Sequence, residues 1–267
     1  MIRRDSELGN HKYSKEVFKE LKIFDIQGLL KQGDIYNCGV EGYQVKDFDL
    51  INFSNLNQDV EEQRLLFCKQ LEIPYYIIIT SQNTKTYQFY ILSYSDEKIT
   101  FKLDKERTKE EAMQWWKKNQ SFDQQKPMYE AAPRIRNSMI DLDLDKSNLA
   151  WGINIDGFIL GRKTKKILAI IENRYTTFPL KEYDPNKWFF HKGGDFHSWN
   201  ILFNLSKKLK VPLILLTYSK DTSKTVGASV VFNVNREGLT YKYKIKPYQN
   251  IFSNDLEGLK GFFRKEL

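Results

Sequence analysis

Two short apolar runs in the second half of the chain each carry one carboxylate, and this pairing constrains the fold more than any other feature. Asp156 lies in the first run, and Glu172 directly follows the second, Ile167–Ile171. The Gly-led polar stretch 161–166 between them predicts a turn that pairs the runs as a β-hairpin. Side chains alternate along a strand, so Arg174 shares the face of Glu172. The pattern predicts an acidic pair with a neighbouring cation at one sheet edge.

Carboxylates on neighbouring strands supply the hard oxygen ligands that Mg²⁺ or Mn²⁺ takes in proteins. Phosphodiester cleavage uses such a metal together with a cation that faces the phosphate. The alternative is that Asp156 and Glu172 are ordinary solvated residues at a sheet edge. The segments that follow Glu172 are therefore needed to decide between a metal site and an ordinary solvated sheet edge.

The next segments predict a helix and then a buried strand. Ile201, Leu202, Leu205 and Leu209 fall at helical spacing, and the apolar run 211–218 is short enough for a buried strand. The predicted order is strand, strand, helix, strand. In this order, and in its Asp followed by Glu-x-basic, the chain resembles the PD-(D/E)XK nuclease superfamily over roughly residues 125 to 235.

The resemblance implies a restriction-endonuclease-like fold, a metal held by Asp156 and Glu172, and hydrolysis of DNA. Arg174 stands where the superfamily usually has Lys. A guanidinium stays protonated and stabilises charge on a phosphate, but it is a poor substitute for a lysine that orients or activates water. Lys192, beside Gly193 and Gly194, is therefore the candidate that assists at the phosphate. Glu130 is the candidate for a further metal ligand.

The first half of the chain repeats the same plan. The segment 36–43 parallels 151–158, which sets Glu41 opposite Asp156, and a helix over 61–71 leads into a strand over 73–80. The run 50–55, interpreted as the next strand, has no acidic or basic residue where Glu172 and Arg174 stand. The first copy is therefore expected to be degenerate, with a structural or substrate-holding role.

The expected fold class is α/β, with two tandem restriction-endonuclease-like units, each a mixed central sheet flanked by helices. The predicted domains are 1–122 and 123–267, with only the second a nuclease. The join follows a helix over 108–118 that begins with a capping-box pattern, Thr108-x-x-Glu111. Its tandem Trp115 and Trp116 suit packing better than base stacking.

Charge is divided unevenly between the halves. Residues 1–120 hold 18 Lys and Arg against 19 Asp and Glu, which leaves 24 against 15 for the remainder. A net charge of +9 in the second part favours a phosphate backbone as partner. A lysine-rich genome bias is the alternative, but it would act on both halves. The predicted nucleic-acid contacts are Arg134, Arg136, Arg162, Lys163, Trp188, Lys207 and Lys208.

Two other groups of residues each allow a functional and a structural interpretation. Asp141, Asp143 and Asp145 alternate as in a calcium loop, but Lys146 stands where that loop needs Gly, so a half-exposed strand or turn is expected. His191 and His197 suit a metal site or a general base, but their polar, aromatic surroundings favour surface or packing roles.

The remaining expectations concern partners and location. No apolar run approaches the roughly 20 residues that span a bilayer, and no signal peptide is evident, so an intracellular protein, cytoplasmic or nuclear, without membrane contact is expected. DNA is the expected partner, with RNA, a homodimer and a larger complex left open. Two other functions compete with the metal-dependent endonuclease: a catalytically inactive nucleic-acid-binding subunit and a purely structural interaction protein.

Overall fold

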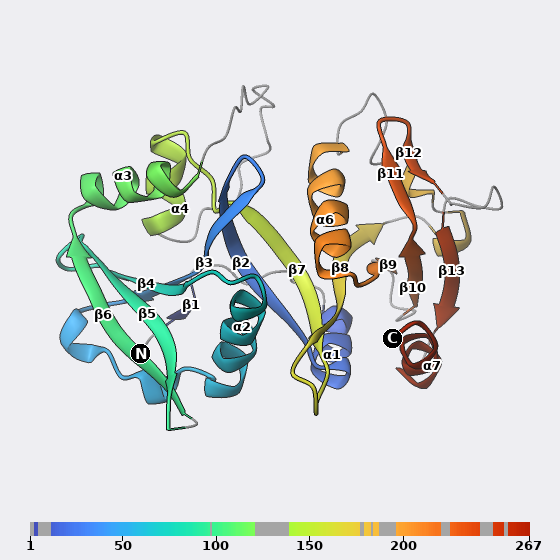
Figure 1. The fold of residues 1–267 in the computed structure, drawn as a ribbon, viewed down its shortest axis with the longest axis horizontal. Helices are drawn as coiled ribbons and strands as arrows, with labels where there is room; N and C mark the ends of the chain where they lie inside the picture. The colour runs from blue at the N-terminus through green and yellow to red at the C-terminus, as the bar shows by residue number, and fades with distance from the viewer. Residues whose placement is uncertain are drawn as a thin grey trace. The chain divides into compact units, whose positions relative to one another are not determined.

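The chain forms a mixed α/β structure that separates into two compact units (Figure 1). Unit 1 comprises Met1–Leu8 and Ile26–Asn154, and unit 2 comprises Gly9–Asp25 and Ile155–Leu267. The expected boundary between residues 122 and 123 lies outside the described residues. This computed structural model describes residues 3–4, 12–96, 98–120, 139–176, 179–182, 184–186, 196–219, 225–240, 248–253 and 256–267.

The strands of unit 1 form a mixed sheet in the order β2-β3-β4-β5-β6, with β1 added along β3. Only β3 and β4 run parallel, and every other neighbouring pair is antiparallel. The elements are β1 (Arg3–Arg4), β2 (Ile23–Gln32), β3 (Ile35–Val45), η1 (Phe48–Leu50), η2 (Phe53–Asn55), α2 (Gln58–Gln70), β4 (Tyr75–Ser81), β5 (Tyr87–Ser95), β6 (Lys98–Arg107), α3 (Lys109–Asn119) and α4 (Met139–Lys146).

Unit 2 has a mixed sheet of the same kind, in the order β7-β8-β9-β10-β13, with β8 and β9 as its parallel pair. A separate ribbon joins β11 to β12. The elements are α1 (Lys12–Leu21), β7 (Ile153–Leu160), β8 (Ile167–Thr176), η3 (Leu180–Glu182), α6 (Phe196–Leu209), β9 (Leu213–Ser219), β10 (Val226–Val231), β11 (Asn233–Asn235), β12 (Gly238–Thr240), β13 (Tyr248–Ser253) and α7 (Leu256–Glu266).

The helices and strands that the sequence predicts around the two parallel pairs are confirmed. α2 and α6 each precede a buried strand, and β7 and β8 pair as a hairpin across the turn 161–166. α3 begins at the predicted capping box, in which Thr108 accepts from the Glu111 N–H and the Glu111 side chain accepts from the Thr108 N–H.

Unit 1 buries its core between the sheet and helices α3 and α4. The buried cluster includes Leu30, Val40, Ile78, Phe89, Ala112, Trp116 and Leu144. Trp116 is almost fully buried and donates its indole N–H to the Ala150 carbonyl at 2.8 Å. This supports the packing interpretation of the tandem tryptophans.

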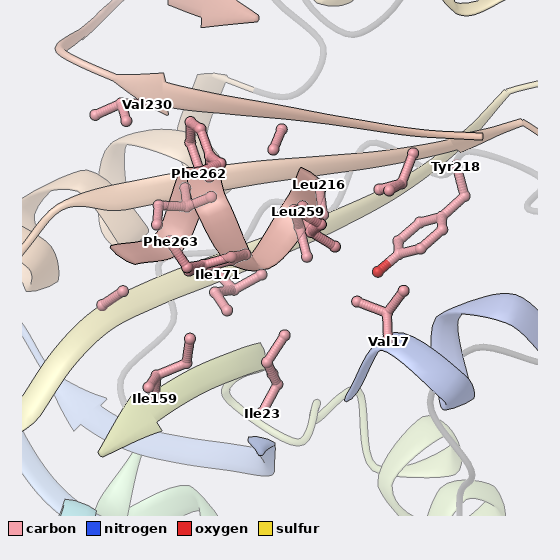
Figure 2. Close-up of a cluster of buried hydrophobic side chains, with 14 of the residues drawn as sticks. Val17, Ile23, Ile159, Ile171, Leu216, Tyr218, Val230, Leu259, Phe262 and Phe263 are labelled. Atoms are coloured by element: carbon pink, nitrogen blue, oxygen red, sulfur yellow. The ribbon is translucent and has the colours of Figure 1, made fainter. Parts of the chain in front are cut away.

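Unit 2 buries one face of its sheet beneath α1 and α7. Figure 2 shows Val17 of α1 and Leu259, Phe262 and Phe263 of α7 directed at side chains of the strands, among them Ile171. Alternation along β8 puts Ile171 on this face and Glu172 on the opposite face, which α6 covers.

The two units repeat one order of elements: a helix, a hairpin, a second helix, and a strand parallel to the second strand of the hairpin. The first helix of each repeat belongs to the other repeat's unit. α1 precedes the first hairpin in sequence but packs in unit 2, whereas α4 precedes the second hairpin but packs in unit 1. Each unit is therefore completed by a helix from the other half of the chain.

Two local predictions are wrong. Residues 50–55 form no strand but parts of η1 and η2, because the Asp47 and Asn52 side chains accept backbone N–H groups two residues on and tighten the chain into turns.

The second wrong prediction is the strand or turn at 141–145, which belongs to helix α4. Ile140 and Leu144 are buried one helical turn apart. The acidic residues fix the helix in place: Asp143 accepts from the Tyr87 hydroxyl and pairs with Lys109 at 2.5 Å. Packing and these polar contacts outweigh the alternating pattern.

Within the described residues, no helix combines the length and apolar character needed to cross a membrane.

Candidate functional site

The predicted acidic pair lies at a fork in the β7–β8 hairpin. Regular pairing of the two strands ends at Gly157 opposite Ile171. Beyond that pair, the Asp156 side chain takes the place of a backbone acceptor, and its Oδ2 accepts the Asn173 N–H at 3.0 Å. The Asp156 carboxylate therefore lies against the backbone between Glu172 and Arg174. We call this group of three charged residues the acidic fork.

Arg174 is bound on two sides within the acidic fork. One of its terminal nitrogens, Nη2, lies 2.7 Å from Glu172 Oε1, and its guanidinium lies 5.6 Å from the ring centre of Trp199 on α6. Glu172 and Trp199 are buried, and Arg174 is partly exposed. The structure thus brings together Asp156, Glu172 and Arg174 as predicted, but with the cation already paired with Glu172.

The carboxylate of Asp156 is costly to ionise in this environment. Burial raises its pKa from 3.8 to about 6, against the opposing influence of the Asn173 N–H and Arg174. The negative charge of Asp25 raises the Asp156 pKa further. The acidic fork therefore has more carboxylates than guanidinium groups, and a bound divalent cation would neutralise the excess negative charge.

Asp25 is a contributor that the sequence analysis missed. It lies near the start of β2, three residues before Gly28, in a segment assigned to the first copy. Asp25 falls in unit 2 together with Asp156, and its charge acts on the Asp156 carboxylate. A signal was available, since Asp25 is an acid between the apolar residues Phe24 and Ile26.

The donor chemistry of the fork suits Mg²⁺ or Mn²⁺, which take carboxylate oxygens and keep several waters. Two carboxylates are enough for such a site when substrate phosphate supplies further ligands. Across the described residues there is no group of three or more His, Cys, Asp or Glu side chains arranged to hold a metal ion. Glu130, the predicted third ligand, lies outside the described residues.

The other predicted residues fall into two groups. Arg162 and Lys163 lie in the exposed turn before β8, and Lys207 and Lys208 are exposed in the last turn of α6. None of these four lies in the acidic fork. His197 is exposed at the start of α6. Lys192, Arg134, Arg136, Trp188 and His191 lie outside the described residues.

The register of the two parallel pairs shows how the repeats correspond. The Gly39 N–H donates to the Pro74 carbonyl at 2.9 Å, and in unit 2 the Ile170 N–H donates to the Pro212 carbonyl at 3.1 Å. Counting two residues on from Gly39 and Ile170 sets Glu41 level with Glu172. The sequence prediction that Glu41 corresponds to Asp156 is therefore wrong. Glu41 corresponds to Glu172, which lies on the next strand.

Gln27 takes the place of Asp156 in the fork of unit 1. The Gly42 N–H donates to Gln27 Oε1 at 2.9 Å, as the Asn173 N–H donates to Asp156. Regular pairing of β2 and β3 stops at Gly28 opposite Val40, one residue from Gln27, in the same way as in unit 2. The two hairpins therefore open at equivalent positions.

Unit 1 carries its own cation at this place. Arg64 of α2 lies 3.5 Å from Glu41 Oε1 and 2.7 Å from Glu61 Oε1, and all three side chains are buried. Glu61 also accepts the hydroxyls of Tyr43 and Tyr75 at 2.5 and 2.6 Å. Unit 1 therefore also has two carboxylates for one guanidinium, but both oxygens of Glu61 already accept tyrosine hydroxyls, which stabilise its charge without a metal.

No protein-family model, no curated protein and no solved structure matches this chain.

Proposed function

We propose that unit 2 is a metal-dependent endonuclease that hydrolyses phosphodiester bonds in DNA. In this proposal both units are restriction-endonuclease-like, and unit 1 is a degenerate copy. The proposal includes an intracellular location, and a homodimer or a larger complex is compatible with this role.

The observation that carries the proposal is the acidic fork itself. Asp156 and Glu172 come from neighbouring strands, and Asp156 accepts the N–H of Asn173, the residue after Glu172. The pKa of Asp156 is raised mainly by burial of its carboxyl group, and the negative charge of Asp25 raises it further. Functional sites concentrate such groups because a ligand, rather than the protein, supplies the missing charge.

The residues of the fork would divide the chemical work as follows. Asp156 and Glu172 would hold Mg²⁺ or Mn²⁺, which when bound polarises the phosphoryl oxygen and lowers the pKa of the attacking water. Arg174 would exchange its bond to Glu172 for one to a phosphate oxygen, and so stabilise the charge that develops there. Trp199 supports the guanidinium from the α6 side. Lys192 would assist at the same phosphate.

A second function is favoured by one observation. Arg174 already binds Glu172 at 2.7 Å, as Arg64 already binds Glu41 and Glu61 in unit 1. If the Arg174 bond persists when nucleic acid is bound, unit 2 would hold nucleic acid without cleaving it. The protein would then be an inactive nuclease-like subunit of a larger complex.

The test incubates purified protein with supercoiled plasmid, linear duplex and single-stranded DNA, and an RNA duplex, in Mg²⁺, Mn²⁺ or EDTA. Glu172→Ala is the site variant, and Glu182→Ala, an exposed glutamate in η3, is the matched control. We expect cleavage of DNA that requires metal, survives in the control and disappears in the site variant. Absence of cleavage with every metal and substrate, from folded protein, would reject the endonuclease and favour the inactive subunit.

A further inference from the structure

We infer that a basic edge of unit 2, separate from the acidic fork, anchors the phosphate backbone of duplex DNA. The basic edge consists of seven exposed cations in two segments. They are Arg162, Lys163, Lys165, Lys166, Lys207, Lys208 and Lys210.

The sheet topology brings the two segments to one end of unit 2. The turn 161–166 leads directly into β8, and the last turn of α6 leads through Pro212 into β9. β8 and β9 run parallel, with Ile170 opposite Leu213. Parallel neighbours begin at the same edge of a sheet, so the turn and the helix end lie at the same edge.

The two segments that form this edge contain basic residues but no acidic ones. Neither residues 157–171 nor residues 203–219 include an Asp or a Glu. Two of the cations, Lys207 and Lys208, are stabilised by the negative C-terminal end of the α6 dipole. The four in the turn 161–166 receive no stabilisation from a helix dipole. Like charges gathered at one edge attract a polyanion such as a phosphate backbone.

Unit 1 supplies an internal comparison for the same edge. Its hairpin turn and the end of α2 carry Lys31, Asp34, Lys69 and Glu72, which sum to zero. Glu72 and Lys210 both follow their helix with a positive φ, of 60° and 57°, so one equivalent position has opposite charge in the two units. The fold alone therefore does not require a basic edge, and its presence in unit 2 is specific to that unit.

Duplex DNA suits this edge better than an anionic membrane surface does. Membrane-binding basic surfaces combine cations with apolar side chains that enter the bilayer. Of the exposed large hydrophobic side chains among the described residues, only Phe232, 36% exposed at the end of β10, comes near this edge. One partly exposed ring gives little apolar area for insertion, whereas phosphate contacts need only cations.

The edge and the fork lie at opposite ends of the hairpin. Glu172 lies six positions after Lys166, which is about 20 Å of strand. That length corresponds to about six base pairs at roughly 3.4 Å each. The basic edge would therefore hold duplex away from the scissile bond. This inference rests on the proposed function only in taking duplex DNA as the polyanion.

The test measures binding of a fluorescent 24-base-pair duplex in EDTA between 50 and 200 mM salt, so that cleavage plays no part. The edge variant replaces Arg162, Lys163 and Lys165 by Gln, and the control replaces Lys31 and Lys69 of unit 1 by Gln. If all seven cations contact phosphates, affinity should fall on the order of 10³–10⁴-fold over this range for the wild type, but only about 150-fold for the edge variant. The control should follow the wild type.

Equal salt dependence in the edge variant and the wild type would overturn the inference, as would an equal loss in the control. Binding to phosphatidylserine vesicles without binding to duplex would reject DNA as the partner. The same variants assayed for plasmid cleavage in Mg²⁺ separate the two proposals. DNA binding that depends on the basic edge, without cleavage by any variant, would reject the endonuclease function and support the basic edge as a DNA-binding surface. Cleavage together with unaltered DNA binding in the edge variant would support the endonuclease and reject the basic edge.

Discussion

Asp156→Asn should make the protein more stable at neutral pH, although it removes a proposed metal ligand. The folded-state pKa of Asp156 is about 6, compared with 3.8 in the unfolded chain. A difference of about two pKa units corresponds to at most ~3 kcal/mol of cost for the ionised carboxylate. Asparagine keeps an oxygen that accepts the Asn173 N–H, so the substitution removes the charge and little else. We expect a gain of about 1–3 kcal/mol at pH 7.5.

The stability gained by Asp156→Asn should increase as pH rises. A carboxyl group with a raised folded pKa binds its proton more tightly in the folded state, so the wild type loses stability as pH rises from about 4 to about 6. Below pH 4 the carboxyl is protonated in both states, and the variant and the wild type should converge. Above pH 6 the difference should be constant.

The assay is urea unfolding of both proteins in EDTA at several pH values between 4 and 8. Asp34→Asn, at an exposed turn, is the control and should show no such pH dependence in its effect. Added Mg²⁺ should then stabilise the wild type more than Asp156→Asn, by about 1.4 kcal/mol at ten times the Kd. A variant less stable than the wild type throughout, or a difference independent of pH, would refute the assigned burial of charge.

Three further predictions concern other residues. Arg64→Met should destabilise the protein by about 3–5 kcal/mol in urea unfolding, because it leaves two buried carboxylates without their cation; a loss below 1 kcal/mol would show that solvent reaches them. Gly39→Ala should cost about 1–3 kcal/mol in the same assay, since an added Cβ would lie 2.3 Å from the sulfur of Cys68, and a neutral effect would contradict that contact. Arg174→Lys should strengthen Mn²⁺ binding about tenfold in calorimetry by weakening the bond to Glu172, and weaker binding would show that the arginine supports the site.

Local patterns predicted much of the fold. The hairpin around 161–166, the helices before the two buried strands, and the capping box at Thr108 all follow from nearest neighbours in sequence: apolar spacing, turn residues and a cap. The grouping of Asp156, Glu172 and Arg174 followed from strand alternation once the hairpin was predicted.

Apart from residues 50–55, where side chains two residues away tighten the chain into turns, the failures involve contacts between residues distant in sequence. Asp143 is helical because it binds Tyr87 and Lys109, neither of which its own segment reveals. Asp25 acts on Asp156 because both residues fold into unit 2, although they lie in different halves of the sequence. Short sequence similarity aligned Glu41 with Asp156. The hydrogen bonds to Pro74 and Pro212, which join residues distant in sequence, align Glu41 with Glu172 instead.

The exchange of α1 and α4 also has a consequence for synthesis on the ribosome. α1 emerges well before α7, yet its apolar residue Val17 packs with Leu259 and Phe262, which follow it by 242 and 245 residues. The Tyr175 hydroxyl that donates to Ser14 follows it by 161 residues. At 5–20 residues per second, α1 waits about 10–50 s for its partners. We therefore expect nascent chains truncated before α7 to bind chaperones through α1, and neither half of the gene to yield a folded unit by itself.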